Sequence, residues 1–201
     1  CFTAWELRPY KLFIIDVKND FTEGGALGVD GGAAVAAGIS DYLRANPERY
    51  DVVIASRDWH DGDNSNGGHF ATDAAPNFVD TWPVHCVAGT PGAEYHSALD
   101  TSLIGIQVRK GQGVPAYSIF EGTTDDGETV PAVLDRLRVD TIDVVGLATD
   151  YCVLASALDA AGSGRHVSVL TGLVAGVAPD SSDAALATMA QTGITLVSSE
   201  A

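Results

Sequence analysis

The chain alternates short, apolar segments rich in β-branched residues with segments whose apolar residues recur at helical spacing. Apolar segments of this kind are typical of strands that are buried on both faces of a sheet. The alternation predicts a mostly parallel sheet covered by helices on both faces, because crossover helices return each strand to the same sheet. The predicted strands are 11–17, 50–56, 105–110, 141–147, 165–171 and 194–197, and the predicted helices are 32–46, 129–139, 151–162 and 182–193.

The predicted fold class is therefore α/β, as a single-domain, three-layer αβα arrangement with a mostly parallel six-stranded sheet. A chain of 201 residues with 46% hydrophobic content is long enough for one substantial core. We assign the domain to 11–201 and interpret 1–10 as an N-terminal extension or an altered end, since the chain does not begin with Met. The segment 57–103 interrupts the alternation, and a loop of that length in a compact domain is usually functional.

The charge of the chain excludes several classes of partner. Eleven Lys and Arg against 27 Asp and Glu give a formal net charge of -16, which repels nucleic acid and anionic membranes. No apolar segment approaches the roughly 20 residues that span a bilayer, and the N-terminus lacks the profile of a secretory signal. Three widely spaced cysteines do not suggest a disulfide framework. The sequence predicts a cytoplasmic protein that acts on a small molecule.

The long loop holds a set of metal-ligand residues, since three of the five histidines lie within 57–86. Asp58 and His60 are alternate residues at a strand end and so can face one ion, while His69 and His85 complete the set from the loop. One Asp and three His leave positions open for water or a ligand, unlike a structural site of four cysteines. We predict one divalent ion (Zn, Fe or Mn) that meets the substrate. The alternative interpretation is a group of hydrated loop histidines.

Three reactive residues follow three predicted strands: Asp16, Lys110 and Cys152. A parallel sheet brings such ends to one edge. Cys152 falls in the first turn of a predicted helix, where the helix dipole and the Lys110 ammonium would favour a thiolate nucleophile. Asp16 would accept the thiol proton and later pass it to a leaving amine, while Lys110 holds the carboxylate in place. The ordinary alternatives are a core cysteine, a loop-capping aspartate and a solvated lysine.

Other features of the sequence receive less specific interpretations. The backbone N–H groups of Ala148 and Cys152, in the turn after a predicted strand, would bind the oxyanion of a tetrahedral intermediate. His96 and His166 have no second type of ligand beside them, so we predict surface or helix-end histidines. Cys86 follows a predicted metal ligand directly, and we favour a buried thiol over a further ligand.

Five stretches of the chain together resemble one enzyme family: DVKNDFTEGGALGV, SRDWH, WPVHCVAGTPGAEYH, Lys110 and GLATDYCV. They are similar to the nicotinamidases, also called pyrazinamidases, of the isochorismatase-like cysteine hydrolases. The resemblance extends from Leu12 to Val197. The Asp, Lys and Cys are shared across the wider family, whereas the DxH and WPxHC elements mark its metal-containing nicotinamidase branch.

The resemblance implies roles for particular residues. It implies a catalytic triad of Asp16, Lys110 and Cys152, a metal site of Asp58, His60, His69 and His85 completed by two waters, and a cis peptide between Leu147 and Ala148. It also implies a ring pocket lined by Phe21, Trp82 and Tyr117, with Tyr151 beside the nucleophile. Two features depart from the family pattern. Lys18 stands where Gln is more usual, and the separation of His60 and His69 is longer than in many relatives.

The resemblance further implies the reaction. Cys152 would attack the carboxamide of nicotinamide, ammonia would leave, and water would hydrolyse the thioester to nicotinate, with the metal binding the ring nitrogen. Pyrazinamide would also be a substrate, and the enzyme would serve NAD salvage. Assembly of the chain into a homo-oligomer is left open. Three alternatives stay open: a hydrolase in which metal-bound water attacks, a different amide or carbamoyl hydrolase on the same scaffold, and a non-catalytic scaffold that binds metal.

Overall fold

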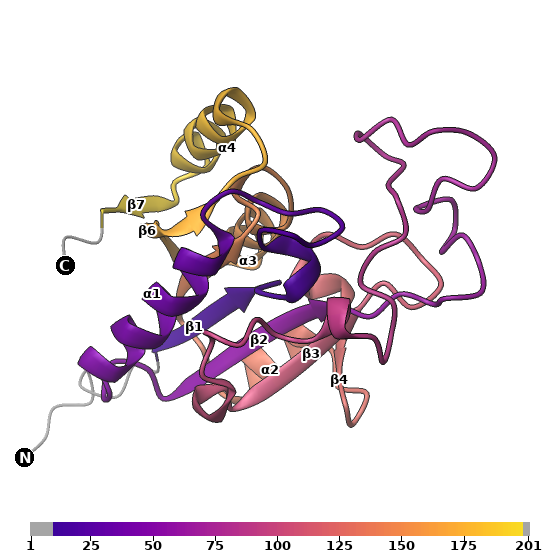
Figure 1. Cartoon of the computed structure of the whole chain (residues 1–201). Coiled ribbons are helices and arrows are strands. Elements are labelled where there is room, and N and C mark those ends of the chain that lie inside the picture. The colour runs from indigo at the N-terminus through magenta and orange to yellow at the C-terminus, as the bar shows by residue number, and fades with distance from the viewer. Residues whose placement is uncertain (1–9, 199–201) are drawn as a thin grey trace, which may run out of the picture.

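A seven-stranded sheet forms the centre of the protein (Figure 1). The computed structural model describes residues 10–198, so the predicted extension 1–10 lies outside the described residues except for Tyr10. The strand order is β4-β3-β2-β1-β5-β6-β7. Six strands are parallel: β1 (Tyr10–Ile15), β2 (Val52–Asp58), β3 (Ile106–Lys110), β5 (Thr141–Leu147), β6 (His166–Ala175) and β7 (Thr195–Val197). These six strands confirm the mostly parallel α/β sheet.

The seventh strand, β4 (Thr123–Thr124), was not predicted. It pairs antiparallel with β3 at the edge of the sheet. Two threonines among glycines and acidic residues carry no apolar pattern, so only the pairing itself reveals this strand. It extends the six-stranded arrangement without changing it.

Four α-helices cover the sheet: α1 (Gly32–Ala45), α2 (Val130–Arg136), α3 (Leu154–Gly162) and α4 (Pro179–Gln191). In Figure 1, α1 crosses in front of the sheet and α2 and α3 lie behind it, which gives the three predicted layers. Helix α1 buries Val35, Ala36, Ile39 and Leu43, a stripe at helical spacing that packs toward β5 and β6. None of the helices in residues 10–198 combines the length and the apolar character that crossing a membrane requires.

The helix ends differ from the predictions for local reasons. Helix α4 begins three residues earlier than predicted, at Pro179, because proline suits the first turn of a helix. Helix α2 ends at Arg136, and Arg138 then adopts a left-handed backbone with φ of 51°. The helix predicted for 151–162 is divided into a π-helical turn, Thr149–Val153, and α3. Apolar periodicity does not encode a π turn, which is a single wider turn of the backbone.

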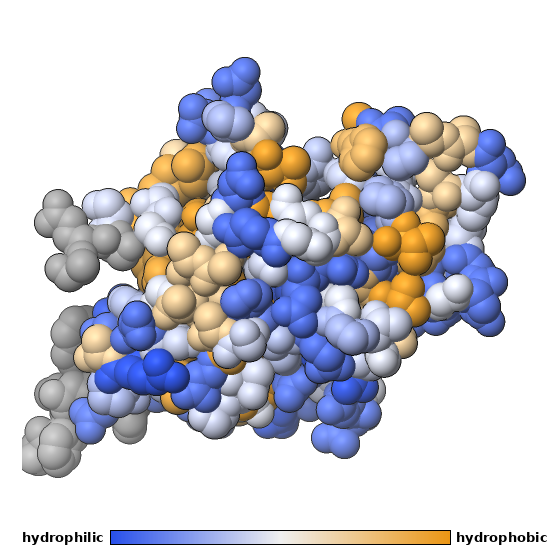
Figure 2. Space-filling view, viewed as in Figure 1, coloured by the Kyte–Doolittle hydropathy of each residue, from blue (hydrophilic) through white to orange (hydrophobic). Residues whose placement is uncertain are grey.

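The long segment 57–103 is a loop with short 3-10 turns at Pro91–Ala93 and Thr101–Leu103, apart from its first two residues, which end β2. Isolated bridges join His60 to Val87 and Phe70 to Trp82, so the loop folds back on itself. Its first part extends to the right of the sheet in Figure 1, where hydrophobic and hydrophilic residues are mixed on the surface in Figure 2. Phe78, Val79 and Val84 are among its exposed apolar residues.

The register of the parallel strands sets the position of the chemistry. Asp58 and Lys110 are direct Cα partners at the ends of β2 and β3. Ile15, the last residue of β1, pairs with both Ser56 and Gly146. The carboxyl ends of β1, β2, β3 and β5 therefore meet at one edge, which is where ligands bind in open parallel sheets.

Gly146 in β5 is a point where the fold tolerates no side chain. Its φ is 119°, and a Cβ atom there would overlap the backbone oxygen of Ile15 on β1. We expect Gly146→Ala to lower the free energy of unfolding by about 2 kcal/mol or more, which corresponds to a Tm about 4–8 °C lower in thermal denaturation followed by circular dichroism.

The matched control is Gly162→Ala at the end of α3, where no atom of the described residues, apart from the adjoining chain, lies within 4 Å of the added Cβ. This substitution should leave Tm unchanged or raise it slightly. Equal stability of the two variants would show that β1 and β5 can separate at Gly146 without cost.

Candidate active site

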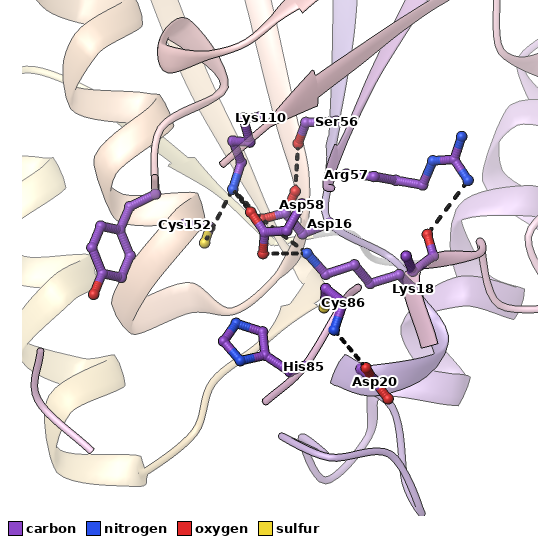
Figure 3. A network of polar contacts seen from close by, with 12 residues as sticks. Asp16, Lys18, Asp20, Ser56, Arg57, Asp58, His85, Cys86, Lys110 and Cys152 are labelled. Carbon is purple, nitrogen blue, oxygen red and sulfur yellow. Dashed lines mark hydrogen bonds and ion pairs between the residues drawn. The ribbon is translucent and has the colours of Figure 1, made fainter. Parts of the chain in front are cut away.

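Asp16, Lys110 and Cys152 form one buried cluster at the carboxyl edge of the sheet (Figure 3). Asp16 follows β1 directly and adopts a left-handed backbone with φ of 50°. The Ser56 hydroxyl donates to Oδ1 of Asp16 at 2.7 Å. Lys110 Nζ lies 2.9 Å from Oδ2 of Asp16 and donates to Sγ of Cys152 at 3.8 Å. The structure thus brings the three residues together, with Lys110 between the carboxylate and the thiol.

The Cys152 thiol is neutral in the resting protein. Burial raises its pKa well above the ordinary value, the Lys110 ammonium opposes this shift, and the nearby Asp16 and Asp58 carboxylates add to it. The Lys110 ammonium thus favours the thiolate, as expected, but burial outweighs it. One ammonium shared with two carboxylates does not offset complete desolvation of the sulfur.

A neutral thiol needs a base, and the cluster contains one. Oδ2 of Asp16 is buried and accepts no hydrogen bond from any described residue, although Lys110 lies beside it as a counter-ion. This oxygen is free to take a proton from the thiol. Ser56 fixes the other oxygen and with it the direction of the carboxylate.

The turn that carries Cys152 has the backbone form that the resemblance implies. The peptide bond between Leu147 and Ala148 is cis, which confirms that expectation. The N–H groups of Tyr151 and Val153 both donate to the Ala148 carbonyl at 3.1 Å and hold the turn closed. Ala148 and Cys152 face the same cavity. Their N–H groups as an oxyanion site stay a prediction.

Three histidines from the loop form a second buried cluster. Ring nitrogens of His60, His69 and His85 all lie within 4.8 Å of one another. Nδ1 of His60 donates to the Gly111 carbonyl and Nδ1 of His85 to the Pro83 carbonyl, each at 2.7 Å. These carbonyls fix the tautomers, so the Nε2 lone pairs of both rings are left to coordinate an ion.

The donor set fits a metal ion. Nε2 of His60 is buried without a hydrogen-bond partner among the described residues, and Nε2 of His69 and His85 face each other at 3.3 Å. Burial lowers the pKa of each of the three rings to about 4. They are therefore neutral at pH 7, which is the form that binds metal.

Asp58 lies beside this cluster and forms ion pairs with two lysines. Lys110 Nζ donates to its Oδ1 at 2.5 Å, and Lys18 Nζ donates to its Oδ2. Burial opposes its charge, but the two ammonium groups hold the pKa of Asp58 well below its usual value. Asp58 is grouped with His85 and Cys86 within 4.8 Å. Three of the four predicted ligands, the histidines, thus have ring nitrogens close enough to bind one ion. The fourth, Asp58, has a carboxylate oxygen close to His85.

A cavity of about 380 Å³ joins the two clusters. Its walls include the three predicted ring-pocket residues, Phe21, Trp82 and Tyr117, and also Tyr151, which was predicted to lie beside the nucleophile. Cys152, Asp58, His69 and His85 line the same cavity. Nε1 of Trp82 donates to the Tyr117 hydroxyl at 3.1 Å, and the rings of Trp82 and Tyr151 meet edge to face at 5.3 Å. Pockets of this size with aromatic walls and a few polar groups are typical of small-molecule sites.

Several residues of the site were missed from sequence. Phe78, Leu27 and Val177 also line the cavity, but nothing distinguishes them from other loop residues in the sequence. Ser56 orients Asp16, and Lys18 is completely buried beside Asp58. The sequence marks Lys18 only as a departure from the family pattern and assigns it no role.

The remaining histidines and thiols match their less specific interpretations. His166 is exposed at the start of β6, and His96 is half-buried with Nδ1 accepting the N–H of Ala98. Cys86 is fully buried, and burial raises the pKa of its thiol. Cys1 lies outside the described residues.

Comparison with known proteins identifies the family. The model of the isochorismatase domain matches residues 10–201. A nicotinamidase/pyrazinamidase of Mycobacterium tuberculosis is 46% identical over 188 residues, which cover 94% of this chain and 98% of that protein. The chain belongs to the isochorismatase-domain family, and its similarity to nicotinamidases confirms the resemblance found in the sequence motifs.

Solved structures agree with this assignment. A pyrazinamidase of Pyrococcus horikoshii in complex with zinc is 34% identical with a TM-score of 0.79, covering 94% of this chain and 98% of that one. PnC1 of L. infantum in complex with nicotinate is 32% identical with a TM-score of 0.81, covering 96% and 93%.

The buried histidines predict how the metal-free protein responds to acid. Their folded-state pKa of about 4 lies below the ordinary value of 6.5, so the unfolded chain binds protons first as the pH falls. The contribution of the three neutral rings to the free energy of unfolding is fully present above pH 6.5, and it is lost as the pH falls from 6.5 toward 4. We expect a lower Tm for chelator-treated protein at pH 5 than at pH 7.5.

The control separates the pH dependence caused by the three histidines from that caused by the 27 Asp and Glu residues. Substituting His60, His69 and His85 together by Gln should make the fall in Tm between these pH values clearly smaller, whereas substituting the exposed His166 by Gln should not. An unchanged pH dependence in the triple variant would assign the acid sensitivity to other groups.

Proposed function

We propose that the protein is a metal-dependent cysteine amidohydrolase that converts nicotinamide to nicotinate and ammonia and also hydrolyses pyrazinamide. The observation that carries this proposal is that Cys152, His69 and His85 line one cavity, whose other walls are mainly aromatic and apolar side chains. A thiol at one side and an ion at the other suit a small aromatic ring that bears both a carboxamide and a ring nitrogen. The similarity to nicotinamidases over nearly the whole chain supports the same substrate class.

The first chemical step joins Cys152 to the substrate. Oδ2 of Asp16 takes the thiol proton as the sulfur attacks the carboxamide carbon, and the carbonyl electron pair moves onto oxygen. The backbone N–H groups of Ala148 and Cys152 bind this oxyanion. When the carbonyl re-forms, the C–N bond breaks, and the proton on Asp16 passes to the nitrogen, which leaves as ammonia.

The second step restores the enzyme. Asp16 takes a proton from water as the water oxygen attacks the thioester carbon, and the C–S bond breaks. The product is nicotinic acid, which gives its carboxyl proton to solvent and leaves as nicotinate. The proton returns to the sulfur, so the resting neutral thiol is recovered. Lys110 stays charged throughout, because burial opposes its charge less than the neighbouring carboxylates favour it, and its pKa lies well above the usual value. It stabilises the carboxylate of Asp16 and the transient thiolate of Cys152 in turn.

The histidine cluster positions the ring. His60, His69 and His85 would hold one divalent ion, with Asp58 as the adjoining fourth residue of the proposed set. Such an ion would act as a Lewis acid for the pyridine nitrogen and so help to hold the ring within the cavity that Cys152 lines. The zinc complex of the Pyrococcus horikoshii relative makes zinc the first ion to test, before iron and manganese. The pyridine ring of the substrate would pack against four aromatic side chains, which exclude water from it: Phe21, Trp82, Tyr117 and Tyr151. A reaction that produces nicotinate would place the enzyme in NAD salvage.

Removal of the nucleophile separates this mechanism from attack by metal-bound water. We expect Cys152→Ala to lower kcat for ammonia release by about 10⁴-fold or more while leaving the metal content unchanged. An electrophilic pyridine analogue should form an adduct on Cys152, located by peptide mass spectrometry. Turnover that survives in Cys152→Ala, or an adduct on Cys86 alone, would contradict the assignment.

The positioning role of the metal predicts a substrate difference. Benzamide lacks the ring nitrogen, so its kcat/KM should be lower than that of nicotinamide by about 10²-fold or more. His85→Ala weakens the proposed metal site and should lower kcat/KM for nicotinamide steeply while changing the low benzamide value little. Equal proportional losses for both substrates would exclude the ring-anchoring role.

A further inference from the structure

Lys18 is a buried cation that the proposed mechanism does not use. It lies in the turn after β1 and is completely inaccessible to solvent. Its Nζ donates to Oδ2 of Asp58, lies 4.0 Å from Oδ2 of Asp16, and sits 4.1 Å from the centre of the Phe21 ring. A buried ammonium is retained in a fold only when its charge is paired, and Asp58 is its closest partner.

Asp58 is thereby held between two ammonium groups. Lys110 approaches Oδ1 at 2.5 Å and Lys18 approaches Oδ2, from opposite sides of the carboxylate (Figure 3). Each lysine occupies one of the two lone pairs on its oxygen, so fewer are left for a metal ion. The single negative charge of Asp58 is also shared with two cations before any ion arrives.

The buried charges at this edge already balance. Asp16 and Asp58 are paired with Lys18 and Lys110, all with side chains 0–3% exposed. The histidines add ligand atoms without adding negative charge. A divalent ion therefore enters a neutral cluster, with an ammonium on the carboxylate that adjoins the histidines.

We propose that Lys18 lowers the metal affinity of this protein by competing with the ion for Asp58. This inference rests on the metal site proposed above and adds a residue that regulates it. The three histidines then carry most of the binding, and the ion exchanges more readily than a full set of one Asp and three His would allow. Lys110 is the less informative of the two lysines to change, because it also contacts Asp16 and Cys152.

The test is a direct measurement of zinc binding. Full-length protein is stripped with a chelator and titrated with Zn²⁺ in competition with a chromophoric chelator of known affinity. Lys18→Met removes the ammonium at similar volume, and Lys18→Gln is a second neutral variant in case the first fails to fold. Lys11→Met is the matched control, because Lys11 is also a buried lysine but pairs with Asp51, away from the site.

Both Lys18 variants should bind Zn²⁺ about 10-fold to 100-fold more tightly than the wild type, and the Lys11 variant should match the wild type. The size equals that of the losses seen when residues that support metal ligands are changed, but the sign is opposite because Lys18 competes with the ion. In an Asp58→Asn background, Lys18→Met should lose most of this gain, because the competition acts through Asp58.

The other outcomes distinguish the inference from the proposed function. One equivalent of zinc in the wild type with equal or weaker binding in both Lys18 variants would overturn the role of Lys18 and leave the metal site standing. A full gain that persists with Asp58→Asn would overturn the competition for Asp58. Absence of binding in every protein would overturn the metal site and the inference together.

Discussion

The active edge of this protein depends on a buried cluster of four charges. Asp16, Lys18, Asp58 and Lys110 are removed from water together, and each charge would cost several kcal/mol if it were unpaired. Asp16, Asp58 and Lys110 come from the ends of β1, β2 and β3, so the pairing requires those strands to end in register. The parallel sheet supplies that register, and the ion pairs in turn oppose any slip of one strand past another.

The same cluster sets the chemistry of the thiol. Lys110 contacts Asp16, Asp58 and Cys152, so its charge is divided among three partners. Because Lys110 is shared in this way, it does not offset the effect of burial, which raises the pKa of the Cys152 thiol. A base must therefore remove the thiol proton, and Oδ2 of Asp16, which accepts no hydrogen bond from the described residues, is suited to do so. A resting neutral thiol also limits side reactions with other electrophiles, because thiolate is the reactive form.

The long loop completes the site from the opposite side. The segments that follow β1, β3 and β5 supply the aromatic residues Phe21, Tyr117 and Tyr151. The loop adds His69, Trp82 and His85 to the same cavity. Its two isolated bridges hold the segment back on itself, which allows residues far apart in the loop to face one cavity. The acid and base groups thus come from strand ends and the three histidines come from the loop, while both regions supply walls of the cavity. Sites formed jointly by strand ends and by loops held on a rigid sheet are common in parallel α/β proteins.

The sequence by itself determined the six parallel strands, the four helices and the types of residue at the site. Strong apolar periodicity predicts such elements, and Asp16, Lys110, Cys152 and the histidines are readable because their chemistry is uncommon at strand ends and in loops. The two-residue β4 and the π turn at Cys152 carry no periodic signal and depend on tertiary pairing. Only the tertiary structure decided that Cys152 is a neutral thiol and that Asp58 lies between two lysines. Both outcomes follow from burial and from distances between residues remote in the chain, which a linear pattern does not contain.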